Sequence, residues 1–142
     1  MDAGQPNRHR EKIGSVAIIG SGIAGIQTAL DIANSGFKVH LVEERPSVGG
    51  VMAQLDKTFP TNDCSSCMMG PKLAELANHP NIEILASTDV LDIAGEPGCF
   101  QVTLKKRARY IDPEKCTACG DCVEVCPVMR PAEHDMRLVN RK

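Results

Sequence analysis

The sequence predicts an α/β fold: a parallel sheet unit followed by a cysteine-rich segment. Three observations support this class: strand-length apolar runs, an amphipathic stretch between the first two runs, and glycines at the turns. A first strand is expected at 16–19, because an unbroken apolar run suits a strand buried on both faces. A helix is expected over 23–34, where apolar residues recur every three or four positions, with Gly36 as its C-cap. A second strand over 38–42 completes a β–α–β unit.

The following residues are rich in loop signals as far as Pro71. Proline is common at the first position of a helix, so a second helix is expected over 71–78, opened by Pro71. Three further strands are expected at 82–85, 88–93 and 99–104, the last two joined by a turn at 95–98.

Composition is that of a globular protein and argues against two classes of partner. Hydrophobic residues make up 42% and aromatic residues 3%, and the net charge is −2. A nucleic-acid reader would be more basic and richer in aromatic side chains, so no nucleic-acid partner is expected. No apolar run is long enough to span a bilayer, and the polar N-terminus lacks the apolar region of a signal peptide. Seven cysteines in such a chain indicate metal ligands or redox groups in a reducing compartment, so we expect a cytoplasmic protein.

A glycine-rich motif stands between the first strand and the first helix. Gly20, Gly22 and Gly25 form G-x-G-x-x-G, in which glycines allow a tight turn, close approach of a pyrophosphate and close helix packing. Glu43 ends the second strand, eighteen residues beyond Gly25, where an acid accepts hydrogen bonds from ribose hydroxyls. The motif predicts a Rossmann-like dinucleotide site and disfavours NADP; the alternative is a glycine turn in another α/β protein.

The residues after Glu43 bear on the choice between NAD and FAD. Arg45, Gly49 and Gly50 form a loop that resembles the one after the second strand in flavoproteins with two dinucleotide-binding domains. In those proteins the double glycine lies close to the flavin nucleotide, so this resemblance implies FAD.

Four cysteines near the C-terminal end follow the pattern C-x2-C-x2-C-x3-C-P. Cys116, Cys119, Cys122 and Cys126 have the spacing of a bacterial ferredoxin [4Fe–4S] half-site. Four thiolates also satisfy Zn²⁺, but zinc ribbons pair two C-x2-C motifs across a longer gap. We therefore predict a [4Fe–4S] cluster. The fourth cysteine of this motif usually ligates another cluster alongside a second copy of the motif, and this chain has no second copy.

Cys64 and Cys67 form a separate C-x2-C pair with three open interpretations. They are a redox-active dithiol near a flavin, or ligands that complete a cluster, or buried thiols packed with Met68 and Met69. Cys99 is interpreted as a core or turn residue.

The motifs, in this order, resemble the N-terminal part of the A-type subunits of heterodisulfide reductase. The matching stretches are VAIIGSGIAGIQTALDIANSGFKVHLVEERPSVGG, FPTNDCSSCMMGPKLAELANHPNIEIL and ARYIDPEKCTACGDCVEVCPV. The resemblance implies an oxidoreductase component in which the glycine loop and Glu43 hold FAD and the four late cysteines hold the cluster. It also implies partner subunits of the heterodisulfide reductase B and C type or of the hydrogenase type.

A basic run precedes the cysteine segment. It is either a solvated face or a docking surface for an acidic electron-transfer partner. Its residues are Lys105, Lys106, Arg107 and Arg109.

Family members continue beyond the ferredoxin-like segment, so we expect this chain to be a fragment or to be completed by another polypeptide. The expected parts are a flexible tail (1–14), an incomplete Rossmann-like domain (15–109), a ferredoxin-like [4Fe–4S] segment (110–130) and a second tail (131–142). The leading expectation is an electron-transfer component that passes electrons between FAD and [4Fe–4S] clusters. The alternatives are a non-enzymatic nucleotide-binding scaffold, or a thioredoxin-reductase-like thiol oxidoreductase that uses Cys64 and Cys67.

Overall fold

The computed structural model describes residues 14–112, 114–131 and 140–141. The chain divides into two compact units, Met1–Arg107 and Ala108–Lys142. The predicted N-terminal tail, apart from Gly14, lies outside the described residues.

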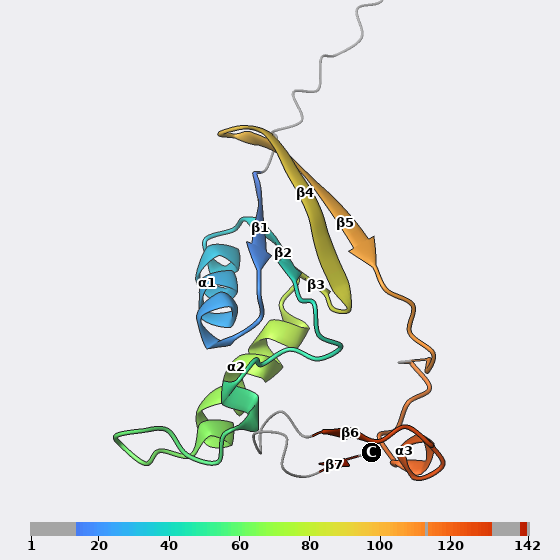
Figure 1. The fold of residues 1–142 in the computed structure, drawn as a ribbon. Helices are drawn as coiled ribbons and strands as arrows, with labels where there is room; N and C mark the ends of the chain where they lie inside the picture. Colours follow the sequence, from blue (N-terminus) through green and yellow to red (C-terminus); the bar gives the residue numbers. More distant parts are fainter. Residues whose placement is uncertain (1–13, 113, 132–139, 142) are drawn as a thin grey trace, which may run out of the picture. The chain divides into compact units, whose positions relative to one another are not determined.

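The first unit is built on a three-stranded parallel sheet (Figure 1). Its strands are β1 (Ser15–Ile19), β2 (Lys38–Val42) and β3 (Ile82–Leu85), in the order β1-β2-β3. The predicted strands and the α/β class are confirmed. Because β2 has a parallel neighbour on both sides, its residues Val39 and Leu41 are fully buried.

Helix α1 (Ile23–Asn34) connects β1 to β2 and confirms the predicted β–α–β unit. Its C-cap is Ser35, and the following Gly36 has φ +93°, a left-handed conformation that glycine adopts without steric cost. Gly36, which was predicted to be the cap, therefore lies one position beyond it, where glycine most often ends a helix.

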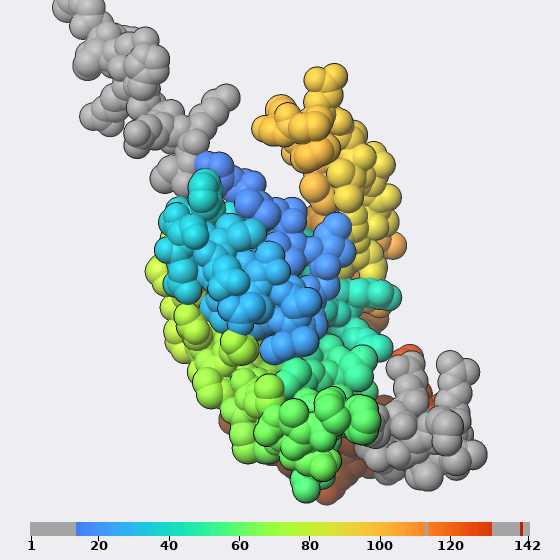
Figure 2. All heavy atoms as spheres, turned by 90° about the vertical axis from the view of Figure 1, so that its left-hand side faces the viewer, coloured from blue at the N-terminus to red at the C-terminus, as the bar shows by residue number. Residues whose placement is uncertain are grey.

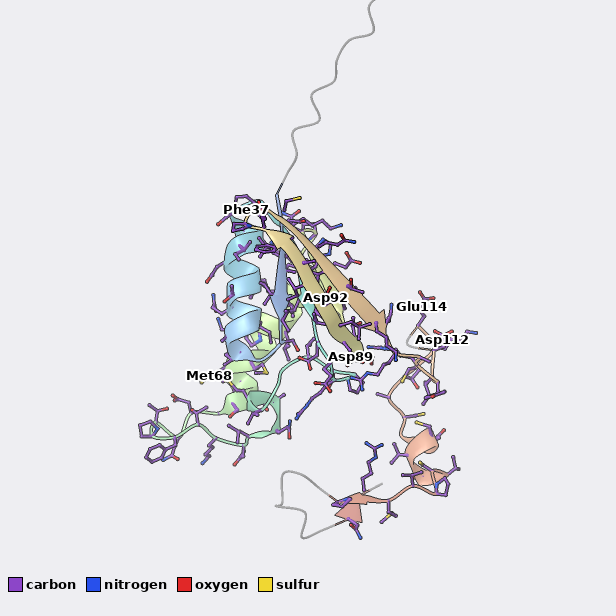
Figure 3. The ribbon with its side chains drawn as sticks, turned by 45° about the horizontal axis from the view of Figure 1, so that its top comes forward. Phe37, Met68, Asp89, Asp92, Asp112 and Glu114 are labelled. Atoms are coloured by element: carbon purple, nitrogen blue, oxygen red, sulfur yellow. A yellow bond between two sulfur atoms is a disulfide. The ribbon has the colours of Figure 1, made fainter. Side chains whose placement is uncertain are left out.

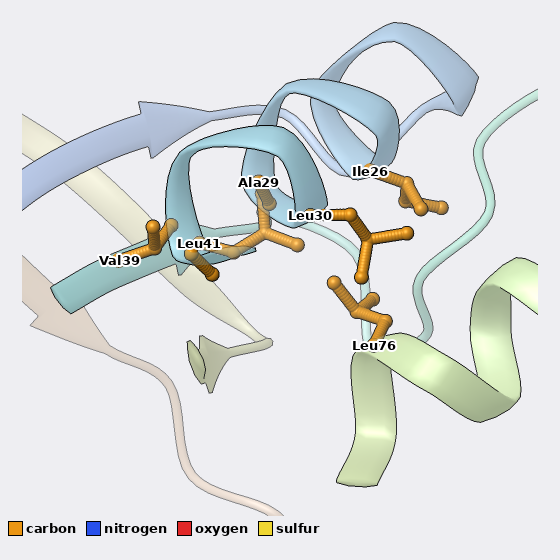
Figure 4. Close-up of a cluster of buried hydrophobic side chains, with 7 residues drawn as sticks. Ile26, Ala29, Leu30, Val39, Leu41 and Leu76 are labelled. Carbon is orange, nitrogen blue, oxygen red and sulfur yellow. The ribbon is translucent and has the colours of Figure 1, made fainter. Parts of the chain in front are cut away.

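The core lies between the helices and the sheet. One face of α1 is buried because its apolar residues recur at helical spacing and meet the apolar residues of β2. Burying a large aliphatic side chain contributes roughly 1.5–3 kcal/mol, so this cluster is the main stabilising feature of the first unit. Figure 4 labels six of its seven buried members: Ile26, Ala29 and Leu30 of α1, Val39 and Leu41 of β2, and Leu76 of the second long helix; the seventh is Ala33.

That second helix, α2 (Ser65–Asn78), begins six residues earlier than predicted. Pro71 lies inside α2 rather than at its start, so the prediction of a helix opened by this proline is wrong. The first two turns are held by tertiary contacts that offset the missing N–H of proline: Ser65 and Met69 are buried, and Cys64 caps the helix. A short 3₁₀ helix, η1 (Met52–Gln54), precedes α2.

Strands β4 (Thr88–Glu96) and β5 (Cys99–Lys106) form an antiparallel hairpin in which both strands extend further than predicted. The hairpin starts beside β2, because the backbone N–H of Thr88 donates to the carbonyl of Glu43 at 2.9 Å. Figure 2 faces α1, with α2 below it, and shows the hairpin as a separate yellow and orange arm.

The second unit contains α3 (Asp121–Glu124) and a two-residue ladder between β6 (Arg130–Pro131) and β7 (Asn140–Arg141). Residues 132–139 of the predicted C-terminal tail lie outside the described residues. Within the ranges that the structure describes, no helix is both long and apolar enough to cross a membrane.

Candidate dinucleotide site and cluster segment

The glycine loop has three glycines with three different geometries. Gly20 has φ +97° and turns the chain from β1 towards α1, while its N–H donates to the carbonyl of Val42 at 2.8 Å. Gly25 packs so closely that a Cβ there would lie 1.9 Å from the carbonyl oxygen of Gly20. A Cβ at Gly22 would meet nothing within 4 Å, so this position faces open space. These are the turn, the close packing and the open approach that a dinucleotide loop requires.

The N-terminus of α1 is suited to a negative charge. Gly22 is its N-cap and makes no side-chain capping bond, and the first turn contains no acidic residue. The first N–H groups of a helix have no partner within the helix and carry a partial positive charge. A phosphate is the ligand that such an end binds well.

A second glycine pair packs against this loop. The N–H of Gly49 donates to the carbonyl of Ser21 at 2.8 Å. A Cβ at Gly50 would lie 2.9 Å from Cα of Gly22, and both Gly49 and Gly50 have positive φ. The 49–50 segment therefore lies directly against the phosphate loop, which only glycines permit.

Glu43 connects the end of β2 to the glycine loop. Its Oε2 accepts hydrogen bonds from the backbone N–H of Ser21 at 2.8 Å and from the Ser21 hydroxyl. Its Oε1 accepts from the backbone N–H of Arg45 at 2.8 Å. Burial by itself raises the pKa of Glu43. The hydrogen bonds from Ser21 and Arg45, together with the positive charge of Arg45, lower this pKa by more than burial raises it, so the pKa lies below its usual value.

A cavity of about 300 Å³ opens beside Glu43. It lies at the carboxyl ends of β1 and β2, where open α/β sheets bind their ligands. Its walls come from β1, the end of β2 and the start of β4, and its lining residues are Ile19, Gly20, Val42, Glu43, Glu44, Thr88, Asp89 and Val90.

Arg107 holds two acidic residues of this cavity, which the sequence did not indicate. Its guanidinium lies 3.2 Å from the Asp89 carboxylate and 3.9 Å from that of Glu44, and it donates to the Glu44 carbonyl. Asp89 is labelled in Figure 3, in the hairpin near the end of β2. Arg107 therefore differs from a purely solvated member of the predicted basic run, since its guanidinium contacts acidic residues of its own unit.

The role of Ser21 was also missed from the sequence, because a serine between two glycines does not indicate a hydrogen-bond partner 22 residues away.

Cys64 and Cys67 form a disulfide at the start of α2. Both residues are exposed, which contradicts the interpretation as buried thiols. Of the two predicted packing partners, Met69 is buried, whereas Met68, labelled in Figure 3, is 46% exposed. Cys99 is exposed and is the first residue of β5, so it is not a core residue; it lies in the strand directly after the turn.

The four late cysteines are free thiols in the second unit. Three are exposed and Cys126 is intermediate in exposure. Ala118 and Gly120, which flank Cys119, both have positive φ, so the chain turns sharply around this second cysteine of the motif. The donor set fits a [4Fe–4S] cluster, because thiolates are the ligands of such clusters and none of these sulfurs is engaged in a disulfide.

The four cysteines predicted as cluster ligands do not form a gathered metal site within the part of the chain that the structure describes. Among the described residues, no three potential ligands converge at metal-binding positions.

Two family descriptions match the chain. Residues 18–83 match an NAD(P)-binding Rossmann-like domain, and residues 109–129 match a 4Fe–4S binding domain. The chain is 51% identical over 137 residues (96% of its length) to an A-type iron-sulfur subunit of the CoB–CoM heterodisulfide reductase of Methanopyrus kandleri. It is 56% identical over 112 residues (79% of its length) to a heterodisulfide reductase A-like protein of Archaeoglobus profundus.

The chain belongs to the family of heterodisulfide reductase A-type subunits. Members of this family are named as subunits of oxidoreductases, and the chain spans 20% of the Methanopyrus relative and 16% of the Archaeoglobus one. The second unit of this family member contains its [4Fe–4S]-binding domain.

Solved structures support the fold of the first unit. The L-proline dehydrogenase of P. horikoshii is similar to 68% of this chain, with 30% identity and a TM-score of 0.53, and 20% of that protein is covered. The thioredoxin reductase of T. acidophilum is similar to 62% of this chain with a TM-score of 0.52, with 29% of that protein covered. At 24% identity the second likeness shows the fold alone.

Proposed function

We propose that this chain is an electron-transfer part of a heterodisulfide-reductase-like oxidoreductase that binds FAD and a [4Fe–4S] cluster. One observation carries the proposal: a dinucleotide loop joined to Glu43 and a 4Fe–4S domain occur in one chain that is 51% identical to a curated heterodisulfide reductase component. When bound, the two cofactors supply hydride and electron transfer, so no acid–base pair of side chains is required.

The first unit holds the adenosine diphosphate half of FAD. Gly22 and the N-terminus of α1 would bind the pyrophosphate, because Gly22 faces open space and the first N–H groups of a helix carry a partial positive charge. The cavity beside Glu43 would take the adenosine. The Gly49–Gly50 segment, which contacts Ser21, and Arg45, which contacts Glu43, would border the nucleotide.

Glu43 receives the ribose. An ionised carboxylate offers about four acceptor positions, of which Ser21 and Arg45 fill three. A ribose hydroxyl therefore takes the remaining position or replaces the Ser21 hydroxyl. The lowered pKa keeps Glu43 ionised, which disfavours a 2′-phosphate at the same place.

The second unit holds the cluster through Cys116, Cys119, Cys122 and Cys126. The positive φ of Ala118 and of Gly120 turns the chain sharply on both sides of Cys119, which supports wrapping of this segment around a cluster. The relatives are named as A subunits, which supports the existence of partner subunits; we propose that these are of the heterodisulfide reductase B and C type or the hydrogenase type.

The test is the content of iron, acid-labile sulfide and flavin per chain after anaerobic preparation. We expect about four iron atoms and one FAD per chain, with flavin absorption peaks over a broad iron–sulfur shoulder. About four iron atoms without flavin would limit this chain to the cluster part of the proposal. A colourless protein that contains zinc would overturn the proposal and favour a nucleotide-binding scaffold.

A further inference from the structure

The disulfide between Cys64 and Cys67 has no role in the cofactor chemistry proposed above. We propose that this pair is a dithiol–disulfide exchange site that is reduced by low-molecular-weight thiols and reoxidised by low-molecular-weight disulfides. The two half-cystines are three residues apart and both are exposed, so an attacking thiol reaches the bond without unfolding. The proposal does not depend on FAD or on the [4Fe–4S] cluster.

Backbone contacts, and not the S–S bond, hold the two cysteines in place. Cys64 pairs with Lys57 in an antiparallel bridge, and the N–H of Ser65 donates to the carbonyl of Asp56 at 3.1 Å. Cys67 lies in the first turn of α2, which continues to Asn78. Opening the disulfide therefore leaves both residues where they are, which a reversible exchange requires.

A disulfide of this short separation is poorly suited to a structural role. The stabilisation that a cross-link gives by restricting the unfolded chain grows with the length of the loop that it closes. Here the sequence separation is three residues, and the helix already fixes most of them. Loss of this bond is consequently a small perturbation of the fold.

The two sulfurs differ in their surroundings. Cys64 is the N-cap of α2, and its Sγ accepts a hydrogen bond from the N–H of Cys67 at 3.1 Å. The N-terminus of a helix carries a partial positive charge, and the first turn of α2 contains no acidic residue. Negative charge is thus better stabilised on Sγ of Cys64, which makes Cys64 the better leaving group and, once reduced, the more abundant thiolate.

A small dithiol reduces the pair in two balanced steps. Its first thiolate attacks Sγ of Cys67, the S–S bond breaks, and the electron pair leaves on Cys64. The second thiolate of the reagent then attacks the reagent's first sulfur, which is bonded to Cys67 in the mixed disulfide, and the Cys67 thiolate leaves. Solvent protonates both protein sulfurs. The reagent is oxidised to a cyclic disulfide, and the protein pair gains two electrons and two protons.

The experiment uses the full chain, oxidised and incubated in native buffer with graded ratios of reduced to oxidised dithiothreitol. Acid quenching, alkylation and peptide mass analysis then report the state of each cysteine. We expect Cys64 and Cys67 to convert together in one reversible two-electron transition. In the reduced protein, limiting iodoacetamide is expected to modify Cys64 several-fold faster than Cys67 at neutral pH.

Serine variants supply the matched comparison. Cys64→Ser keeps an oxygen acceptor at a helix N-cap, where serine is favoured, so α2 is expected to keep its start and circular dichroism is expected to be unchanged. This variant should leave Cys67 open to alkylation without any reductant. Cys99→Ser, which changes an exposed free thiol in the same unit, should leave the transition unchanged.

Two results would overturn the proposal. One is a disulfide that opens only in denaturant, which would make it structural. The other is a Cys64→Ser variant that loses about four iron atoms per chain, which would make the pair cluster ligands. Both readouts are independent of flavin binding, so a chain without FAD still tests the exchange site.

Discussion

The glycine loop of the first unit and the cysteine segment of the second both carry a short motif with fixed spacing, but the structure prepares them differently. The loop is held by hydrogen bonds among Gly20, Val42, Ser21 and Glu43, so its geometry exists before any ligand binds. The four cysteines 116–126 are free and mostly exposed, and among the described residues their sulfurs do not converge.

The difference follows from what each motif is made of. A phosphate loop is formed by backbone groups, whose positions are set by the strand and the helix that flank it. A cluster site is formed by side chains whose thiolates repel one another until a metal neutralises them. We therefore expect changes to the loop to act on the fold as well as on binding, and changes to the cysteines to act on the cluster alone.

The largest expected effect is the loss of the cluster when one ligand is removed. Cys119→Ser should reduce the iron content from about four atoms per chain to nearly none, because a hard oxygen ligand replaces a thiolate. Iron and sulfide analysis, with the visible absorption of the cluster, measures this. The thermal unfolding of the first unit should not change, and Cys99→Ser, the control, should keep its iron. Retention of full iron content by Cys119→Ser would rule out Cys119 as a ligand.

A second large effect is expected at Gly25. In Gly25→Ala the new Cβ lies 1.9 Å from the carbonyl oxygen of Gly20, so the helix has to move away from β1. Such overpacking costs about 1–3 kcal/mol of unfolding free energy, which urea denaturation measures.

Gly22→Ala is the matched variant, because its Cβ would meet nothing within 4 Å and its φ of −70° suits alanine. It should lower the unfolding free energy by less than about 1 kcal/mol and still weaken ADP binding, since the methyl group occupies the phosphate approach. Equal destabilisation by both variants would contradict the division of roles between these glycines.

An intermediate effect is expected for Glu43→Gln. Loss of a charged acceptor costs about 1.5–3 kcal/mol, so the affinity for ADP should fall roughly ten- to a hundredfold in titration calorimetry. Its control is Glu96→Gln, which changes an exposed carboxylate of β4 that does not line the cavity. Unchanged affinity in Glu43→Gln would remove Glu43 from the ribose site.

The same variant gives a pH dependence. The folded state lowers the pKa of Glu43, so the ionised group stabilises the fold above its unfolded pKa of about 4.3. This contribution is lost as the pH falls through the lower, folded pKa. From about pH 5 to about pH 3 the unfolding free energy of the natural sequence should therefore decrease more than that of Glu43→Gln. Parallel pH profiles of the two proteins would count against the hydrogen-bonded, ionised Glu43.

The smallest effect is expected at Arg107. Arg107→Ala frees Asp89 and Glu44 at the cavity, and because exposed ion pairs contribute about 0.2–1 kcal/mol, ADP affinity should fall less than about tenfold. High salt should reduce the difference by screening. Lys106→Ala removes a neighbouring exposed charge and should bind ADP like the natural sequence; an equal loss in both variants would indicate a general charge effect.

The sequence predicted much of this structure because much of it is local. The spacing of apolar residues located β1, α1, β2 and β3, and the glycine loop was placed between the strand and the helix that hold it. The start of α2 was missed for a physical reason: a proline usually marks the first turn, and here buried contacts of Ser65 and Met69 outweigh its missing hydrogen bond.

What the residues alone determined is the chemistry: a glycine loop with an acid beyond it, and four thiolates with the spacing of a cluster half-site. What only the three-dimensional structure decided is which groups meet across the chain. Ser21 reaches Glu43, and Arg107 reaches Asp89 and Glu44. The reason is that spacing along a strand or helix fixes neighbours within a few residues, whereas contacts between distant residues depend on how the sheet and the hairpin are assembled.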